Sequence, residues 1–307
     1  MEDKYKLYLG DTKKIVAEMV EREELVDMIF TSPPYFAFRK NYNGDDDGKV
    51  GSIHVDDYAD WLLEFTEQFL KVLKPNGSFF LNINEKIDKG EIHPVLDELK
   101  YKMRIQGWKL VAKPYIWYKK QSMPTNCKYR AIDRYEYVYH FSNSNKPKFR
   151  ADNCRIPHSE STIKRVKTPV PTINSRDGVY EYGELKLNKK GSLPHNVVIT
   201  AAESNPSVLH PAPFHVELAD WFVRIGSDEG DIVLDPFAGS STTGVASLKN
   251  NRKFIGIDMI DFNIEFGRKR MDYFLETGKA YIPKKELEPL GIDVNYYKVK
   301  GKHANNP

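Results

Sequence analysis

The sequence lacks the features that mark exported and membrane-spanning proteins. It has only two cysteines in 307 residues, Cys127 and Cys154, and these suit neither a disulfide framework nor a CxxC metal site. No run of about 18 uncharged apolar residues is present, and the N-terminal residues do not show the basic-then-apolar order of a signal peptide. These absences predict a cytoplasmic protein that does not cross a membrane.

Familiar metal and nucleotide signatures are missing as well. The eight histidines form neither an HExxH pattern nor a close cluster, so the sequence predicts no metal site. There is no GxGxxG loop and no GxxxxGK[ST] loop, which disfavours both a nicotinamide dinucleotide and a P-loop nucleotide as the cofactor.

What is present is the composition and periodicity of a globular α/β protein. Hydrophobic residues make up 40% of the chain and charged residues 29%. Short apolar runs predict buried strands at residues 5–9, 26–30, 78–83, 109–118, 135–141, 231–234 and 253–257. Amphipathic segments predict helices at residues 57–73, 92–106, 214–225, 242–250 and 262–276. This alternation predicts a mostly parallel sheet with helices on both faces.

The region 143–196 interrupts this alternation. It is polar, contains several prolines, and indicates an insertion rather than another strand-helix unit. Between residues 146 and 190 there are eleven Lys or Arg against five Asp or Glu, an excess of six, although the whole chain has a net charge of only +3. Such a stretch suits a polyanion, because Lys and Arg replace the counterions condensed on phosphates. A solvated surface insertion explains the charge equally well.

One segment has the pattern of a cofactor-binding loop: Asp231-Ile-Val-Leu-Asp-Pro-Phe-Ala-Gly-Ser-Ser-Thr-Thr-Gly244. A buried strand ends at Asp235, and a loop of small residues then leads into a helix whose first N–H groups face the loop. The next strand ends at Asp258, where an acid is positioned to hold two ribose hydroxyls. The pair predicts an adenosine-containing cofactor. A tight strand-to-helix turn remains an alternative for the glycines alone, but it explains Asp235 and Asp258 poorly.

A second abrupt loop follows the apolar strand that begins at Val26. It contains Ser32, Pro33, Pro34 and Tyr35. Prolines have a fixed φ and no N–H, so we expect their carbonyls to point outward as free acceptors. With the serine hydroxyl and the tyrosine ring, such a loop can accept hydrogen bonds from an exocyclic amine and stack on its ring. A rigid surface turn is the alternative.

Both loops resemble motifs of one family. Thr31-Ser-Pro-Pro-Tyr35 resembles the catalytic motif of DNA amino-methyltransferases, which methylate the exocyclic nitrogen of cytosine or adenine with S-adenosylmethionine. Asp235-Pro-Phe-Ala-Gly-Ser-Ser-Thr-Thr243 resembles their cofactor motif. The catalytic motif comes first, with Asp235 203 residues after Ser32 and the basic insertion between them, as in the permuted β class. The resemblance implies a Rossmann-like methyltransferase sheet plus a small DNA-recognition region.

Lesser matches extend the resemblance. Leu9-Gly-Asp11 resembles the segment whose acid binds the adenine of the cofactor, and His210-Pro-Ala-Pro-Phe214 resembles the segment that encloses its methionine end. Ile116-Trp-Tyr-Lys119 resembles a stretch near the target-base pocket. The sequence departs from the family at Ser241, where glycine is usual, and at Asp258, where glutamate is commoner.

The resemblance implies a role for each part of the chain. Residues 1–142 would form the catalytic part, 143–196 the target recognition region, 197–281 the cofactor-binding part and 282–307 a C-terminal tail. The implied catalytic residues are Ser32, Pro33, Pro34 and Tyr35, and the implied cofactor-binding residues are Asp11, Thr31, Pro213, Phe214, Asp235, Pro236, Phe237, Gly239, Ser241, Thr242 and Asp258. The implied DNA-binding residues are Lys164, Arg165, Lys167 and Arg176.

The expected reaction is methyl transfer to N4 of cytosine in double-stranded DNA. Ser32 and the Pro33 carbonyl would accept the amine hydrogens, and Tyr35 would stack on a base flipped out of the duplex. Serine before Pro-Pro-Tyr favours cytosine, whereas aspartate is commoner for adenine, so adenine N6 is the alternative within the family. Outside it, the alternatives are a non-catalytic DNA-binding protein on the same fold and an RNA or protein methyltransferase. A separately acting restriction endonuclease is the implied partner, and a homodimer is left open.

Overall fold

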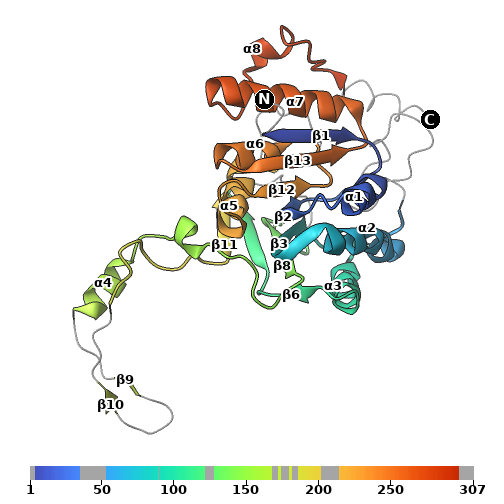
Figure 1. The fold of residues 1–307 in the computed structure, drawn as a ribbon. Helices are drawn as coiled ribbons and strands as arrows, with labels where there is room; N and C mark the ends of the chain where they lie inside the picture. Colours follow the sequence, from blue (N-terminus) through green and yellow to red (C-terminus); the bar gives the residue numbers. More distant parts are fainter. Residues whose placement is uncertain are drawn as a thin grey trace. The chain divides into compact units, whose positions relative to one another are not determined.

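The computed structural model describes residues 4–34, 53–88, 90–121, 128–167, 172–173, 180–181, 186–201 and 214–296 (Figure 1). The chain divides into two compact units. The larger unit is built from Met1–Phe149 together with Asn196–Pro307, and the smaller unit is Arg150–His195. The larger unit contains the central sheet and both predicted loops.

A nine-stranded sheet forms the centre of the larger unit. In spatial order its strands are β1 (Tyr5–Leu9), β13 (Lys253–Asp258), β12 (Ile232–Asp235), β2 (Val26–Thr31), β3 (Leu73–Ile83), β8 (Tyr135–Ser142), β7 (Tyr115–Lys119) and β11 (Val197–Thr200), while β6 (Lys109–Leu110) also pairs with β8. Neighbours from β1 to β3 are parallel, β8 is antiparallel to β3 and β7, and β11 is parallel to β7. The mostly parallel α/β sheet confirms the predicted fold class.

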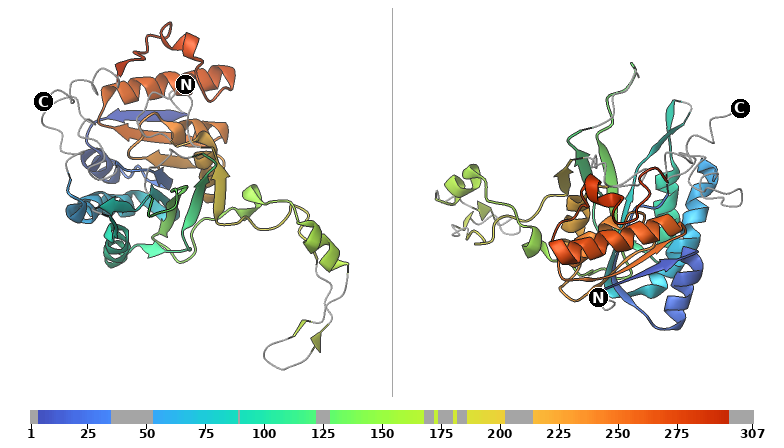
Figure 2. Two further views of the ribbon diagram at one scale, coloured as in Figure 1. Left: turned by 180° about the vertical axis from the view of Figure 1, so that it is seen from behind. Right: turned by 90° about the horizontal axis from the view of Figure 1, so that it is seen from above.

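Helices cover both faces of this sheet (Figure 2). One layer is formed by α1 (Thr12–Glu21), α2 (Tyr58–Val72, preceded by the short helix η2, Val55–Asp57) and α3 (Val95–Ile105). On the other face α5 (Val216–Gly226) packs against α6 (Thr242–Lys249), which in turn packs against α7 (Asp261–Thr277). The short α8 (Lys284–Leu287) follows α7. None of the helices within the described ranges is long and apolar enough to cross a bilayer.

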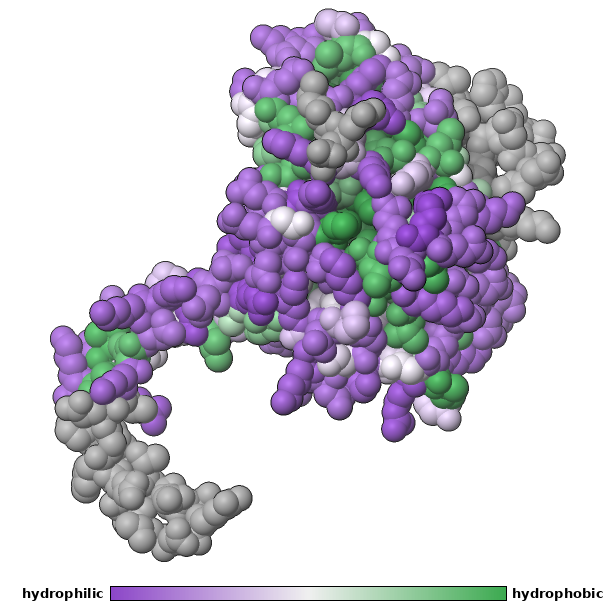
Figure 3. Space-filling view, viewed as in Figure 1, coloured by the Kyte–Doolittle hydropathy of each residue, from purple (hydrophilic) through white to green (hydrophobic). Residues whose placement is uncertain are grey.

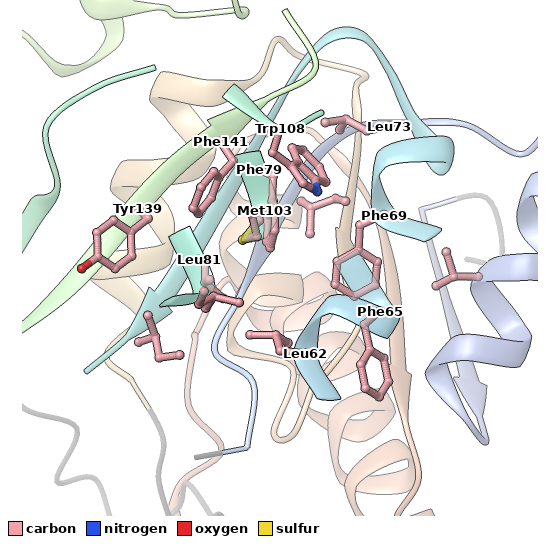
Figure 4. Packing of buried hydrophobic residues seen from close by; sticks show 14 of the residues in the cluster. Leu62, Phe65, Phe69, Leu73, Phe79, Leu81, Met103, Trp108, Tyr139 and Phe141 are labelled. Atoms are coloured by element: carbon pink, nitrogen blue, oxygen red, sulfur yellow. The ribbon is translucent and has the colours of Figure 1, made fainter. Parts of the chain in front are cut away.

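Aromatic side chains fill the space between the sheet and the α1–α3 layer (Figure 4). Phe65 and Phe69 lie one turn apart on α2, which places them on the same face of the helix. The Phe69 ring meets Phe79 of β3 edge to face at 5.7 Å, and Phe79 lies 5.2 Å from Trp108. From Gly77 to Ile83 every residue of β3 is buried, so the strand is covered on both faces over this part, as a central strand requires.

The second face of the same strands is closed by α5. Phe222 of α5 stacks on Phe30 of β2 at 5.3 Å and lies 5.0 Å from Phe80 of β3. A Cβ at Gly226 would come within 2.5 Å of the Phe80 ring, so this glycine permits the close approach of the helix to the sheet. The ends of β2 and β3 are therefore fixed from both sides.

Three of the predicted element boundaries are wrong. The strand expected at 78–83 is β3, which begins at Leu73 and follows α2 directly. The strand expected at 109–118 is two separate strands, β6 and β7, because Pro114 between them has no N–H to donate to a ladder. The helix expected from residue 92 begins at Val95, and Glu91–His93 instead forms β5, which pairs with β4 (Lys86–Asp88). The elements α1, α8 and β11 and the β4–β5 hairpin were not predicted.

The smaller unit has little regular structure among its described residues. It contains η3 (Ala151–Cys154), the two-turn helix α4 (Glu160–Val166), and the short antiparallel strands β9 (Thr172–Ile173) and β10 (Tyr180–Glu181). The isolated bridge between Ile156 and Ser192 joins its two ends. Its described surface is mostly hydrophilic in the view of Figure 3, and α4 has no buried residue.

Candidate active site

Three parallel strands end together beside both predicted loops. β2 ends at Thr31, β12 at Asp235 and β13 at Asp258. β12 pairs with β2 on one side and with β13 on the other, so all three carboxyl ends lie at one edge of the sheet. In open α/β sheets this edge is where ligands bind. The catalytic and cofactor motifs, far apart in the sequence, thus meet at one place.

Asp235 connects the two motifs directly. One of its oxygens, Oδ1, accepts a hydrogen bond of 2.6 Å from the Thr31 hydroxyl, and Oδ2 accepts one of 2.6 Å from the Thr243 hydroxyl. The Phe237 N–H also donates to Oδ1, at 3.2 Å. The residue is only 1% exposed. This carboxylate therefore ties the end of β2, the cofactor loop and the start of α6 into one structure.

Burial makes Asp235 an unusual acid. Desolvation raises its pKa to about 6, and the hydrogen bonds from Thr243 and Thr31 oppose that rise only in part. The neutral, protonated form of this carboxyl group is therefore favoured more than it would be on the protein surface.

The raised pKa predicts a pH-dependent loss of stability that Asp235→Asn should remove. Because the folded-state pKa lies above that of the unfolded chain, the proton stabilises the fold below about pH 4, and this stabilisation is lost as the pH rises through about 6. Raising the pH from 5 to 7.5 should therefore remove about 1 to 1.5 kcal/mol of this stabilisation. Urea unfolding at the two pH values should show a correspondingly smaller decline for Asp235→Asn than for the wild type. An exposed Asp261→Asn variant serves as control, and equal declines in all three proteins would contradict the prediction.

Asp258 organises the other side of the loop. Oδ2 accepts a hydrogen bond from Gly239 N at 2.8 Å, and Oδ1 accepts from Ile260 N at 2.8 Å and Asn263 Nδ2 at 3.0 Å. Burial raises the pKa of this carboxyl group as well. Its backbone carbonyl accepts from Gly10 N at 3.0 Å, which fixes the end of β1 beside it.

The loop between β12 and α6 has a strained backbone. Gly239 and Ser241 both have positive φ, +49° and +55° respectively. Only glycine adopts such a conformation without steric cost, and for serine the cost is about 1 to 2 kcal/mol. Opposite Ser241 lies Gly267 of α7, where a Cβ would come within 2.2 Å of the serine hydroxyl oxygen. The glycine on α7 thus makes room for the side chain that this chain has in place of the usual glycine.

Arg270 of α7 fixes the loop between β12 and α6 by hydrogen bonds. It was not among the residues predicted from the sequence. Its Nη1 donates to the Ser240 carbonyl at 2.9 Å and to the Thr242 hydroxyl at 3.0 Å, and Nε donates to the Ala280 carbonyl at 3.1 Å. The guanidinium group is also 5.3 Å from the centroid of the Tyr281 ring, and the residue is 1% exposed. The available signal was periodicity, since Arg270 falls on the buried face of α7 with the apolar residues.

The catalytic segment is described as far as Pro34. The Pro34 carbonyl accepts a hydrogen bond of 3.0 Å from the hydroxyl of Tyr58, so the expectation that it points outward as a free acceptor is wrong. Burial raises the pKa of Tyr58, which keeps this hydroxyl protonated as a donor. Within the described residues, the Ser32 hydroxyl and the Pro33 carbonyl form no such bond. Tyr35 lies outside the described residues.

Two other predicted cofactor residues have structural partners of their own. Asp11 is the N-cap of α1, where its carboxylate accepts hydrogen bonds from the N–H groups of Lys13 at 2.7 Å and Lys14 at 3.4 Å. Phe214 meets the ring of Phe30 edge to face at 5.4 Å, next to the end of β2.

The remaining predicted residues are divided between the loop, the smaller unit and the undescribed part of the chain. The Pro236 carbonyl accepts a hydrogen bond of 2.6 Å from the Thr12 hydroxyl, and Phe237 packs 5.2 Å from Phe65. Thr242 begins α6. In the smaller unit, exposed side chains are found at Lys164, Arg165 and Lys167. Pro213 and Arg176 lie outside the described residues.

Comparison with known proteins identifies the family. A family model described as DNA methylase, covering N6 and N4 methyltransferases, matches residues 26–267. The chain is 27% identical over 278 residues to the type II methyltransferase M.PvuII of Proteus hauseri, covering 82% of this chain and 79% of that protein. It is 29% identical over 273 residues to the DNA adenine methyltransferase YhdJ of Escherichia coli K12, covering 86% and 80% respectively.

Solved structures show the same fold. The PvuII DNA methyltransferase, described as cytosine-N4-specific, superposes with a TM-score of 0.65 at 22% identity, covering 96% of this chain and 92% of that one. The complex of M1.HpyAVI with S-adenosylmethionine gives a TM-score of 0.55 at 20% identity, covering 87% and 99%. The matched family and the shared fold confirm the predicted resemblance and the predicted cofactor. The chain belongs to the DNA methylase family and is an S-adenosylmethionine-dependent DNA methyltransferase with the motif order of the β class.

Proposed function

We propose that the chain transfers a methyl group from S-adenosylmethionine to the exocyclic N4 of cytosine in double-stranded DNA. The observation that carries this proposal is the 2.6 Å hydrogen bond between Thr31 and Asp235. Ser32 directly follows Thr31, so the bond fixes the start of the catalytic segment against the cofactor loop. An amine held by Ser32 would then face a methyl group held by that loop.

The two strand-end acids suit a ligand with hydroxyl groups and positive charge. Among the described residues, neither Asp235 nor Asp258 forms an ion pair, and both carboxyl groups have raised pKa values through burial. S-adenosylmethionine supplies a methyl group on a positively charged sulfonium, together with two ribose hydroxyls. We assign the ribose to Asp258, at the end of the second strand, and the positively charged end to the Asp235 side of the loop. Both assignments follow from position at the strand ends.

The remaining implied cofactor contacts are proposed with the roles that the resemblance gives them. Thr31, Pro236, Phe237, Gly239, Ser241 and Thr242 would line the cofactor along the loop, with Asp11 near its adenine and Pro213 and Phe214 near its methionine end. The Asp11 carboxylate also caps α1, and its Oδ1 receives both N–H groups. A carboxylate has about four acceptor positions, so capping leaves capacity for an adenine amine.

The proposed chemistry is mainly one of positioning. An exocyclic amine is a poor nucleophile because its lone pair is delocalised into the ring. Hydrogen bonds from the amine to the Ser32 hydroxyl and the Pro33 carbonyl would draw the nitrogen toward tetrahedral geometry and free its lone pair for in-line attack on the sulfonium methyl group. The methyl–sulfur bond would break as the carbon–nitrogen bond forms, and the nitrogen would lose one of its two protons. The target atom is inaccessible within a duplex, so the base must be flipped out, and Tyr35 is the residue assigned to stack on it.

Adenine N6 methylation is the second candidate, because one relative is named a DNA adenine methyltransferase. Serine before Pro-Pro-Tyr supports cytosine, as does the description of the PvuII enzyme as cytosine-N4-specific.

Several relatives are named type II methyltransferases, which supports a role beside a separately acting restriction endonuclease. We assign target recognition to residues 143–196, which include the whole of the basic stretch.

Nucleoside mass spectrometry of DNA treated with the purified protein tests the proposal. The expected product is N4-methylcytosine. Ser32→Ala should lower kcat by about 5- to 150-fold, equivalent to one transition-state hydrogen bond of about 1 to 3 kcal/mol, while the affinity for S-adenosylmethionine is retained.

Thr277→Ala, which removes an exposed hydroxyl at the C-terminal end of α7, is the matched control and should leave kcat unchanged. If N6-methyladenine were the main product, the base assignment would be wrong. If neither base were methylated, the assignment of catalytic activity would be wrong.

A further inference from the structure

Three polar side chains from three neighbouring strands form a cluster near the catalytic segment. Asn82 of β3 donates from Nδ2 to Glu136 Oε2 of β8 at 3.1 Å and to the Tyr137 carbonyl at 3.1 Å. Lys119 of β7 donates from Nζ to Glu136 Oε1. We name Asn82, Lys119 and Glu136 the Glu136 cluster. No step of the proposed mechanism uses it.

The Glu136 cluster lies on the face of the sheet that α5 covers. Phe80, His140 and Tyr115 share that face, since the Phe80 ring stacks on His140 at 4.2 Å and Tyr115 lies 5.3 Å from Phe222 of α5. Successive side chains along a strand alternate between faces. Asn82 is two residues from Phe80 on β3, Glu136 is four residues from His140 on β8, and Lys119 is four residues from Tyr115 on β7. Because each of these separations is even, all three members of the cluster lie on the same face of the sheet as the aromatic residues.

Register places the cluster beside Ser32. Thr31, the last residue of β2, pairs with Leu81 of β3, and Ser32 and Asn82 are the residues that directly follow this pair. Glu136 is on β8, two strands from β2. Lys119 is on β7, three strands from β2, but its ammonium group reaches back to Glu136 Oε1 and so lies beside the Glu136 carboxylate. With about 4.8 Å between strands, the separation of β8 from β2 is about 10 Å, which is the span of one pyrimidine ring with a hydrogen bond of about 2.9 Å at each side.

Lys119 is held firmly in this position. Its ammonium group lies 4.6 Å from the centroid of the Trp117 ring, and the Trp117 Nε1 donates to the buried Thr200 hydroxyl at 2.8 Å. The side chains of Lys119 and Glu136 are only 24% and 12% exposed. The free energy of removing two such charges from water is about as large as the free energy gained from their attraction. A gain in stability therefore does not explain why this ion pair is present. An ammonium group has three donor positions and Glu136 Oε1 occupies one.

We propose that Lys119, oriented by Glu136 and Trp117, recognises the target base by donating a hydrogen bond to O2 of the flipped cytosine. This inference rests on the proposed function. With the N4 amine at Ser32 and Pro33, the far acceptor of cytosine is its O2. Adenine in the same orientation presents a C–H group there, which accepts nothing. A fixed ammonium at that end therefore favours cytosine over adenine.

Lys119→Met tests the proposal by removing the donor while keeping an unbranched side chain against Trp117. The value of kcat/KM for cytosine methylation should fall by about 10- to 150-fold, as expected for one hydrogen bond to a charged donor. The value of kcat/KM should fall less in Glu136→Gln than in Lys119→Met, because Lys119 is retained. The neighbouring exposed Lys120→Met loses the same charge and should keep its kcat. Cofactor affinity should match the wild type in every variant. The urea unfolding midpoint should be lower in Lys119→Met, because Glu136 loses its ion-pair partner, while a cooperative transition shows that the fold is retained.

A modified substrate gives a second test that does not depend on the variants folding. An oligonucleotide carrying 2-thiocytosine at the target has sulfur, a weak acceptor, in place of O2. The wild-type enzyme should methylate it at least about 10-fold less efficiently than cytosine, and Lys119→Met should show no further loss, because coupled groups are not additive. Equal rates on both oligonucleotides with the wild type, or full activity of Lys119→Met, would overturn the proposal.

Product analysis separates this inference from the proposed function. If the wild type makes N6-methyladenine, the proposed function fails, and the O2 contact fails with it. If it makes N4-methylcytosine while Lys119→Met remains fully active, the proposed function stands and only the role of Lys119 is lost.

Discussion

Asp258→Ala is expected to lower the affinity for S-adenosylmethionine by about 10- to 150-fold, through loss of a charge-assisted hydrogen bond to the ribose of about 1.5 to 3 kcal/mol. It should also lower the free energy of unfolding by about 2 to 5 kcal/mol, because the N–H groups of Gly239, Ile260 and Asn263 lose their common acceptor. Isothermal titration calorimetry and urea unfolding measure the two effects separately.

Asp258→Asn separates the ligand contact from the internal one. An amide oxygen in the place of Oδ1 still accepts two of the three internal hydrogen bonds, so this variant should be less destabilised than Asp258→Ala while losing the charge that strengthens the ribose contact. Asp258→Glu restores the acid that is commoner in the family and should bind the cofactor better than either. Cofactor affinity unchanged in Asp258→Ala would remove Asp258 from the binding site.

The positions of the two acids could be predicted because each depends on local sequence. An apolar strand followed by small residues and then a helix determines where the strand ends, and Asp235 and Asp258 are the last residues of their strands. Their hydrogen-bond partners could not be predicted in the same way. Thr31 and Asp235 are 204 residues apart, and nothing in either segment specifies that β2 and β12 are neighbours.

Some failures have a local cause. The helix α1 was missed because only three of its ten residues are buried, Thr12, Val16 and Met19, and they are too few to produce a clear apolar stripe. Asp11 was a recognisable N-cap signal, but a ligand role was assigned to it instead. The strand β11 has only four residues and an exposed edge position, so its pattern is weak.

Other failures concern contacts between distant segments. The Pro34 carbonyl was expected to be free because proline removes a donor from the loop, yet its acceptor is used by Tyr58 from α2. Arg270 was overlooked because a buried arginine is rare unless it is paired. Here its partners are loop carbonyls and a hydroxyl, which become visible only when α7 is placed beside the loop.

The geometry explains how a serine is accommodated in the cofactor loop. Ser241 has the left-handed conformation that glycine normally supplies, and its side chain needs the space left by Gly267. Arg270 fixes the residues on either side of it, through the Ser240 carbonyl and the Thr242 hydroxyl. The strain is thus offset by packing and hydrogen bonding from α7, and the loop remains ordered at the N-terminus of α6.

Neutralising three basic side chains of α4 and its C-cap is expected to have the largest effect on DNA binding. If Lys164, Arg165 and Lys167 contact phosphates, replacing all three with glutamine should make the plot of log K against log salt shallower by about 2.7, at about 0.9 per contact. Binding at 0.1 M salt should then weaken by about two to three orders of magnitude. Cofactor affinity should not change, since the residues lie in the smaller unit.

The control must remove the same charge without touching the smaller unit. Replacing Lys279, Lys284 and Lys285, which are exposed in the larger unit, lowers the net charge by the same three units. Any general electrostatic attraction to DNA falls equally in both triple variants, whereas the loss of specific phosphate contacts affects only the first. Fluorescence anisotropy with a labelled duplex, measured from about 0.05 to 0.3 M salt, gives both slopes. Identical slopes for the α4 variant and the wild type would mean that this helix faces solvent in the complex, and that DNA is held by other parts of the chain.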